Sequence, residues 1–173
     1  MKFLQVARFD ASDDHVYSPA AQVDELAVTG SFVFSFAEED PETLTGKAAL
    51  AFRNGFLGLD SFGWASVVRV IDIRDDEYEA AVRRLAQHLV DRFGAPSIEA
   101  AMPVARQEVE YASGLCEHPA GTLLTVERQA VDGEIHESFK RVQQKKGNQT
   151  ADWQGNSGQV RIWDMFPETD NKM

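Results

Sequence analysis

An Asp132-Gly133 dipeptide between two alternating segments constrains the fold of this chain more than any other feature. Residues 122–131 and 134–142 each alternate between apolar and polar side chains. The dipeptide accepts positive φ at both turn positions, so it favours a two-residue type I′ turn, which fixes the register of the strands that it joins. Counting back from this turn gives the facing pairs Val131 and Glu134, Ala130 and Ile135, Arg128 and Glu137, and Val126 and Phe139.

The remaining periodic segments predict three more strands and three helices. The strands are expected at residues 2–9, 26–36 and 64–73, and the helices from Asp40 to Gly55, from 76 to 93 and from Ser97 to about Cys116. Residues 26–36 alternate with a period of two, with Gly30 at a bulge, and residues 64–73 are apolar on both sides, as in a central strand. Gly55 is expected to end its helix in a left-handed cap. The pattern predicts an α+β fold over residues 1–142, with a mostly antiparallel sheet of about five strands and about three helices packed on one face.

Composition bounds the class of protein. The 173 residues fit one domain, and no apolar run approaches the roughly 20 residues that a membrane-spanning helix needs. The first residues turn polar and acidic too soon for a secretory signal, and a single cysteine agrees with a reducing cytoplasm. The net charge of −11 disfavours phosphate backbones and anionic lipid. We therefore expect a cytoplasmic protein that binds neither nucleic acid nor membrane.

The stretch from Phe52 to Trp64 concentrates four aromatic residues and three glycines. Its glycine spacing does not match a dinucleotide or phosphate loop, and it leads from a helix to a strand, whereas phosphate loops lead from a strand into a helix. The favoured interpretation is a hinge whose rings pack between helix and sheet. The alternative is a ligand pocket that uses Arg53, Asp60 and Trp64, because an acid among apolar residues can have a perturbed pKa.

Two parts of the sequence resemble a known family. The run from Gly55 to Trp64 and the later run LCEHPAGTLLTVERQAVDGEIHESFK, from Leu115 to Lys140, are similar to a family of short uncharacterised bacterial proteins. That family is a domain of unknown function, and the likeness spans about residues 2–142. The resemblance implies a bacterial source and supplies no activity, cofactor or catalytic residue.

Few residue patterns suggest chemistry. Cys116 and His118 bring a thiol close to an imidazole, but Cys116 falls on the apolar stripe of its helix, where a thiol packs as a small hydrophobe. His15 lies beside Asp13 and Asp14 in a cluster that could hold a cation weakly, and an acidic solvated loop is the favoured interpretation. His88 lies at the edge of a helix stripe, and His136 faces Gln129 across the hairpin. No metal-ligand spacing or catalytic triad motif occurs. We expect no metal and no cofactor.

Arg128 and Glu137 are the most informative charged residues. The predicted register places them opposite each other, on the same face as Val126 and Phe139. Charges on an apolar face must be paired, lie at its rim or serve a ligand. Pairing at the rim is the favoured interpretation, and a ligand-binding role is the alternative.

The C-terminal residues differ from the rest of the chain. Residues 143–158 are polar and glycine-dotted, which is typical of a linker, and the following QVRIWDMF segment is rich in interface-type residues. Residues 143–173 are therefore predicted to be a linker and a docking segment for a second copy or a protein partner. The proposed contact residues are Trp153, Trp163, Met165 and Phe166.

Two function classes remain open. The first is a non-catalytic accessory or protein-interaction protein, favoured because no catalytic set is assembled in the sequence. The second is a small-molecule-binding protein or enzyme with a pocket near residues 53–64. In that case Arg53, Asp60 and Trp64 would act with Arg128 and Glu137. A deep pocket lined by these side chains would favour the second class, and pairing among them would favour the first.

Overall fold

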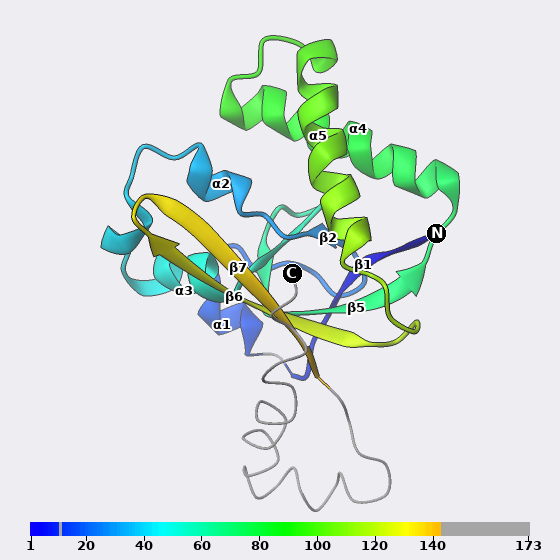
Figure 1. The fold of residues 1–173 in the computed structure, drawn as a ribbon, viewed down its shortest axis with the longest axis horizontal. Helices are drawn as coiled ribbons and strands as arrows, with labels where there is room; N and C mark the ends of the chain where they lie inside the picture. The colour runs from blue at the N-terminus through cyan, green and yellow to red at the C-terminus, as the bar shows by residue number, and fades with distance from the viewer. Residues whose placement is uncertain (11, 143–173) are drawn as a thin grey trace, which may run out of the picture.

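An antiparallel sheet of seven strands forms the framework of the molecule, which is described by a computed structural model for residues 1–10 and 12–142 (Figure 1). In spatial order the strands are β4 (Trp64–Ala65), β3 (Phe56–Gly58), β2 (Leu26–Val28), β1 (Lys2–Ala7), β5 (Val67–Asp72), β6 (Leu123–Val131) and β7 (Glu134–Val142). The α-helices are α1 (Asp13–Val16), α2 (Phe32–Ser35), α3 (Gly46–Asn54), α4 (Asp75–Phe93) and α5 (Ile98–Gly114), with a 3₁₀ turn at Pro41–Thr43. The α+β class is confirmed.

The β6–β7 hairpin has the predicted register. Asp132 and Gly133 have φ values of 53° and 81°, as the two-residue turn requires. The facing pairs are those counted from the turn, including Arg128 with Glu137 and Val126 with Phe139. Local turn chemistry is therefore sufficient to set the longest pairing in the sheet.

The helices α4 and α5 lie close to the predicted ranges of 76–93 and Ser97 to about Cys116. Gly94 ends α4 in a left-handed conformation with φ 80°, and the Ser97 hydroxyl caps α5 by accepting the Ala100 N–H at 3.1 Å. The two helices lie together on one side of the sheet (Figure 1), and the main core lies between them and β1 and β5. None of the helices in the described ranges is both long and apolar enough to cross a membrane.

The prediction of one strand over residues 26–36 is wrong. The strand stops at Val28, Gly30 has φ 86°, and the chain then forms α2. The alternating phenylalanines serve two clusters: Phe32 packs edge-on against Phe93 with ring centroids 5.5 Å apart, and Phe34 packs against Phe52 at 5.1 Å. A period of two thus arises here from ring packing and not from a pleated strand.

The helix expected from Asp40 to Gly55 is split. The Asp40 carboxylate caps a short 3₁₀ turn by accepting the Glu42 N–H at 3.0 Å, and α3 begins only at Gly46. Gly55 has φ −97°, so the predicted left-handed cap is wrong. Gly55 is needed for a different reason, because a Cβ there would lie 2.7 Å from the Trp64 ring.

The predicted counts of strands and helices were too low. The two additional strands are β3, which lies inside the supposed hinge, and β4, which a break at Ser66 separates from β5. The additional α-helices are the short α1 and α2. The helices also do not share one face, because α1 and α3 lie beside the β6–β7 hairpin, away from α4 and α5 (Figure 1).

Candidate functional site

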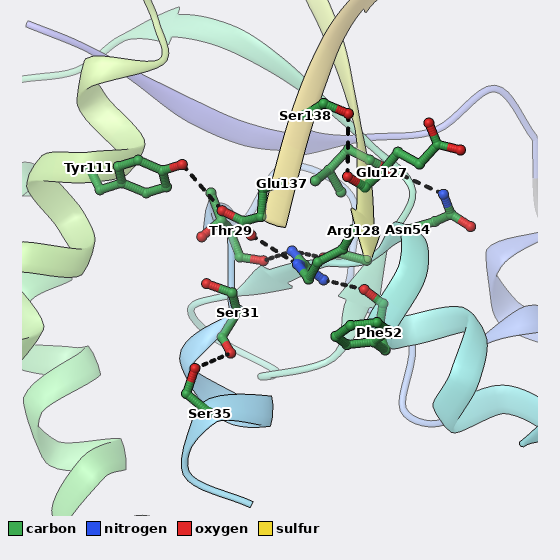
Figure 2. A network of polar contacts seen from close by, with 12 residues as sticks. Thr29, Ser31, Ser35, Phe52, Asn54, Tyr111, Glu127, Arg128, Glu137 and Ser138 are labelled. Carbon is green, nitrogen blue, oxygen red and sulfur yellow. Dashed lines mark hydrogen bonds and ion pairs between the residues drawn. The ribbon is translucent and has the colours of Figure 1, made fainter. Parts of the chain in front are cut away.

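Arg128 lies at the centre of a buried polar network (Figure 2). Its side chain, 1% exposed, points from β6 toward the end of α3, and its Nε donates to Oε2 of Glu137 at 2.8 Å. The two terminal nitrogens donate to main-chain carbonyls of Phe52 at 2.6 Å, Thr29 at 2.8 Å and Gly55 at 3.0 Å. The pair is formed as the sequence suggested, but it lies in the interior and not at the rim.

The acceptors explain why an arginine occupies this position. The last carbonyls of an α-helix have no partner within the helix and carry its negative dipole end, so a cation stabilises them. The planar guanidinium reaches several such acceptors at once, which a lysine ammonium on its flexible stem does not. Burial lowers the pKa of Arg128 and the Glu137 carboxylate opposes that shift, yet an arginine stays charged because its ordinary pKa lies far above neutrality. The network joins β6, β7, α3 and the end of β2.

Negative charge accumulates on the outer side of this network. The second Glu137 oxygen, Oε1, accepts the Tyr111 hydroxyl at 3.2 Å. Burial and the Glu137 charge both raise the pKa of Tyr111, and they raise the pKa of Glu108 to about 6. The charge of Glu137 thus acts on two residues of α5, Tyr111 and Glu108.

A groove of about 790 Å³ runs between the β6–β7 turn and the segment that contains α2 and the 3₁₀ turn. It is lined by five acids and by no lysine, arginine or histidine of the described residues. The acids are Glu39, Asp40, Glu42, Glu134 and Glu137. The remaining surface includes Phe34, Tyr111 and Ile135. We call this surface the acidic groove, and its lining combines carboxylates with apolar and aromatic side chains.

Replacing Glu108 by glutamine should stabilise the protein at pH 8 and not at pH 4. The pKa of Glu108 is raised from 4.5 to about 6, so the folded state retains its proton where the unfolded state has lost it. Stability is therefore lost as pH rises through this range, by on the order of 1 kcal/mol, and the amide removes that loss. Urea unfolding at pH 4 and at pH 8 measures the free energy of unfolding of the two proteins. Glu110→Gln, an equal charge change at an exposed position of α5, should show no such pH dependence.

The loop between β3 and β4 is organised by Glu25, a residue that sequence reasoning missed. Its buried carboxylate accepts the N–H groups of Gln22 at 2.6 Å, Asp60 at 2.6 Å and Ser61 at 2.9 Å, and the Ser61 hydroxyl at 2.6 Å. Gly58 leaves room for this carboxylate, because a Cβ there would lie 2.5 Å from it. The loop backbone thus binds an anion that belongs to the protein itself.

The residues proposed for a pocket in the 53–64 stretch are separated. Arg53 is exposed on α3, Asp60 is 61% exposed and pairs with Arg84 at 2.8 Å, and Trp64 is buried beneath Gly30 and Gly55. Asp60 is therefore not the acid in apolar surroundings that the sequence suggested. Glu137 lines the acidic groove, and neither Arg53 nor Asp60 contributes to that groove.

A shallower groove of about 520 Å³ does adjoin this stretch. Leu57, Ser61, Phe62 and Trp64 contribute to it, together with His88 and other residues of α4. The rings of Phe62 and His88 stack with centroids 3.6 Å apart, and burial lowers the pKa of His88. His88 is thus a packed residue at the edge of α4, as predicted.

The single thiol of the protein lies in the hydrophobic core. Cys116 is buried, and burial raises its pKa to about 12, so the nucleophilic thiolate form is suppressed. His136 faces Gln129 as predicted. No group of three or more histidine, cysteine, aspartate or glutamate side chains in residues 1–10 and 12–142 is arranged to hold a metal ion. The predicted interface residues Trp153, Trp163, Met165 and Phe166 lie outside the described residues.

The fold and these sites define a small α+β protein whose buried charges bind its own backbone. The family model of a family of unknown function, DUF6505, matches residues 1–154. The chain therefore belongs to this family, which confirms the resemblance seen in the sequence. No curated protein and no solved structure matches the chain.

Proposed function

We propose that the protein is a non-catalytic cytoplasmic interaction protein whose acidic groove binds a positively charged segment of a protein partner. The observation that carries this proposal is the lining of the groove, which combines five carboxylates with apolar and aromatic side chains and has no basic residue among those that the structure describes. Charge complementarity of this kind steers association and selects partners.

The contacts made by the buried charged side chains favour a binding role over catalysis. Arg128 and Glu25 direct their polar atoms to main-chain groups, and Arg128 and Glu137 are paired with each other. Side chains committed in this way stabilise the fold and are not presented to a substrate. The exposed carboxylates of the groove are different, because Glu39, Glu42 and Glu134 face solvent.

Removing three charges from the acidic groove should weaken binding of a basic peptide at least tenfold. The probe is a labelled nonapeptide of alternating lysine and leucine, and its affinity is measured by fluorescence anisotropy at two salt concentrations. The groove variant is Glu39→Gln, Glu42→Gln and Glu134→Gln; Asp40 is left intact because it caps the 3₁₀ turn. We expect binding to weaken as salt rises, since exposed charges are screened.

A matched variant separates the groove from the overall charge. Glu99, Glu110 and Glu117 are exposed acids away from the groove, and their replacement by glutamine changes the net charge equally. This control should lower affinity less than twofold. Equal losses in the two triple variants would reject the groove as the binding surface and would leave only the general acidity of the protein as the cause.

A second candidate is a small-molecule site at the groove beside residues 57–64. The stacked pair of Phe62 and His88 favours it, because a flat apolar ligand could extend the stack. Arg53, Arg128 and Glu137 do not line this groove, so the candidate rests on Trp64 and its neighbours. Native mass spectrometry of protein purified from its own host tests it, because a retained ligand would add a defined mass.

We also propose that residues 143–173 contribute a docking segment to a homo-oligomer or partner contact, with residues 1–142 as the domain that carries it. Trp153, Trp163, Met165 and Phe166 supply side chains of the type enriched at interfaces. Deleting residues 145–173 should lower the oligomer mass in light scattering or reduce solubility. An unchanged mass and solubility would reject this segment as the contact.

A further inference from the structure

A cavity of about 610 Å³ lies between α1, the end of α3 and strands β5, β6 and β7. Its volume falls within the range of small-molecule pockets, about 300–1,000 Å³. Asp13, Tyr17 and Ser66 form a polar end. The apolar part of the lining is formed by Phe9, Val16, Leu50, Val67 and Val126.

The Asp13 carboxylate is the unusual group in this cavity. It is 7% exposed, and it accepts the Ser66 N–H and the Ser66 hydroxyl, both at 3.2 Å. The ion pairs among the described residues do not include it. The Arg8 guanidinium, which also lines the cavity, pairs with Asp14 at 2.9 Å. A buried carboxylate without a cation is costly, so a cationic ligand would stabilise it.

The hydroxyl groups beside Asp13 also favour a ligand that donates hydrogen bonds. Ser66 uses its single hydroxyl proton toward Asp13, so in the 2.8 Å contact between Tyr17 and Ser66 the tyrosine is the donor. The Tyr17 oxygen then keeps its lone pairs for a further donor. The polar end of the cavity therefore offers carboxylate and phenol acceptors.

We propose that this cavity binds a small primary amine with an apolar body. The ammonium donates to Asp13 and Tyr17, and the hydrocarbon part packs against Leu50, Val67 and Val126. The balance of charge in the lining adds to this preference, since the acids Asp10, Asp13 and Glu127 outnumber the bases Arg8 and Lys140. The site is independent of the acidic groove, because the two surfaces share no lining residue.

Isothermal titration of the full chain with 2-phenylethylamine tests the proposal, with 2-phenylethanol as the neutral probe of the same shape. We expect the amine to bind at least tenfold more tightly than the alcohol. Asp13→Asn keeps the size of the side chain and should lower amine affinity at least tenfold. Glu127→Gln removes an equal charge from an exposed position of the same lining and should lower it less than threefold.

A second variant keeps the test decisive if Asp13→Asn does not fold. Leu50→Trp fills the apolar wall from a half-buried position and should abolish binding of both probes while leaving the circular dichroism spectrum unchanged. Equal affinity for amine and alcohol, no amine binding to the wild-type protein, or full amine affinity in the Leu50→Trp protein would overturn the proposal. The triple variant of the acidic groove should bind the amine normally, so failure here is distinguishable from failure of the proposed partner site.

Discussion

Replacing Arg128 by methionine should lower the free energy of unfolding by about 3–5 kcal/mol, the cost of removing one partner of a buried ion pair. Methionine replaces the aliphatic stem of arginine, so the change removes the guanidinium group with its charge and donors. Glu137 would lose its buried cation, and the carbonyls of Thr29, Phe52 and Gly55 would lose their donors. Four segments of the chain meet at this guanidinium, so the loss should affect global unfolding. Urea denaturation followed by circular dichroism measures it.

Two further variants show which part of the network matters. Arg53→Met makes the same change at an exposed position of α3 and should alter the unfolding free energy by less than about 0.5 kcal/mol. The double variant Arg128→Met with Glu137→Gln should recover only part of the loss, because the three carbonyls remain without donors. A full recovery would show that the ion pair alone accounts for the stabilisation, and a loss below 1 kcal/mol for Arg128→Met would contradict the role given to the network.

Gly63→Ala should destabilise the protein by roughly 2–3 kcal/mol, the upper part of the range for overpacking. A Cβ at Gly63 would lie 2.5–2.7 Å from main-chain atoms of Ala20 and Ala21. Main-chain atoms cannot rotate away as a flexible side chain can. The segment around Gly63 must therefore move apart from residues 20 and 21. They are also joined by hydrogen bonds, from Ala21 N–H to the Trp64 carbonyl at 2.9 Å and from Trp64 N–H to the Pro19 carbonyl at 3.0 Å. We expect a lower midpoint in urea and a lower melting temperature.

Gly114→Ala is the matched control. Gly114 is the last residue of α5, and a Cβ there meets no atom within 4 Å. Alanine should leave stability unchanged or raise it by up to about 1 kcal/mol, because it lowers the chain entropy lost in forming the helix. Similar losses at Gly63 and Gly114 would mean that close approach is not the reason for glycine at Gly63.

The elements that could be predicted from the sequence are those governed by local chemistry. The Asp132-Gly133 turn sets the register of β6 and β7, and the apolar stripe of α4 sets its length, without help from distant residues. Residues 26–36 show the limit of such reasoning. Their alternating phenylalanines have partners on α3 and α4, so the same pattern is satisfied by a short strand followed by a helical turn.

The buried polar sites likewise include parts that follow from local sequence and parts that depend on distant residues. The facing of Arg128 and Glu137 follows from the hairpin register and was predictable, whereas the carbonyl acceptors come from residues more than 70 positions away. Glu25 was missed because an acid in a loop is normally solvated, and its partners Asp60 and Ser61 are about 35 residues downstream. The sequence favours a solvated loop for Asp13 and its neighbours, and nothing local indicates that α1 buries this carboxylate against Ser66.

The burial of Cys116 has a practical consequence for testing these proposals. It is the only cysteine of the 173 residues, and its protonated, enclosed thiol should react slowly with maleimides. A cysteine introduced at the surface, such as Ser35→Cys, would therefore take up a fluorophore or spin label selectively without prior removal of the native one. Probes attached in this way could follow peptide docking in real time on otherwise unaltered protein.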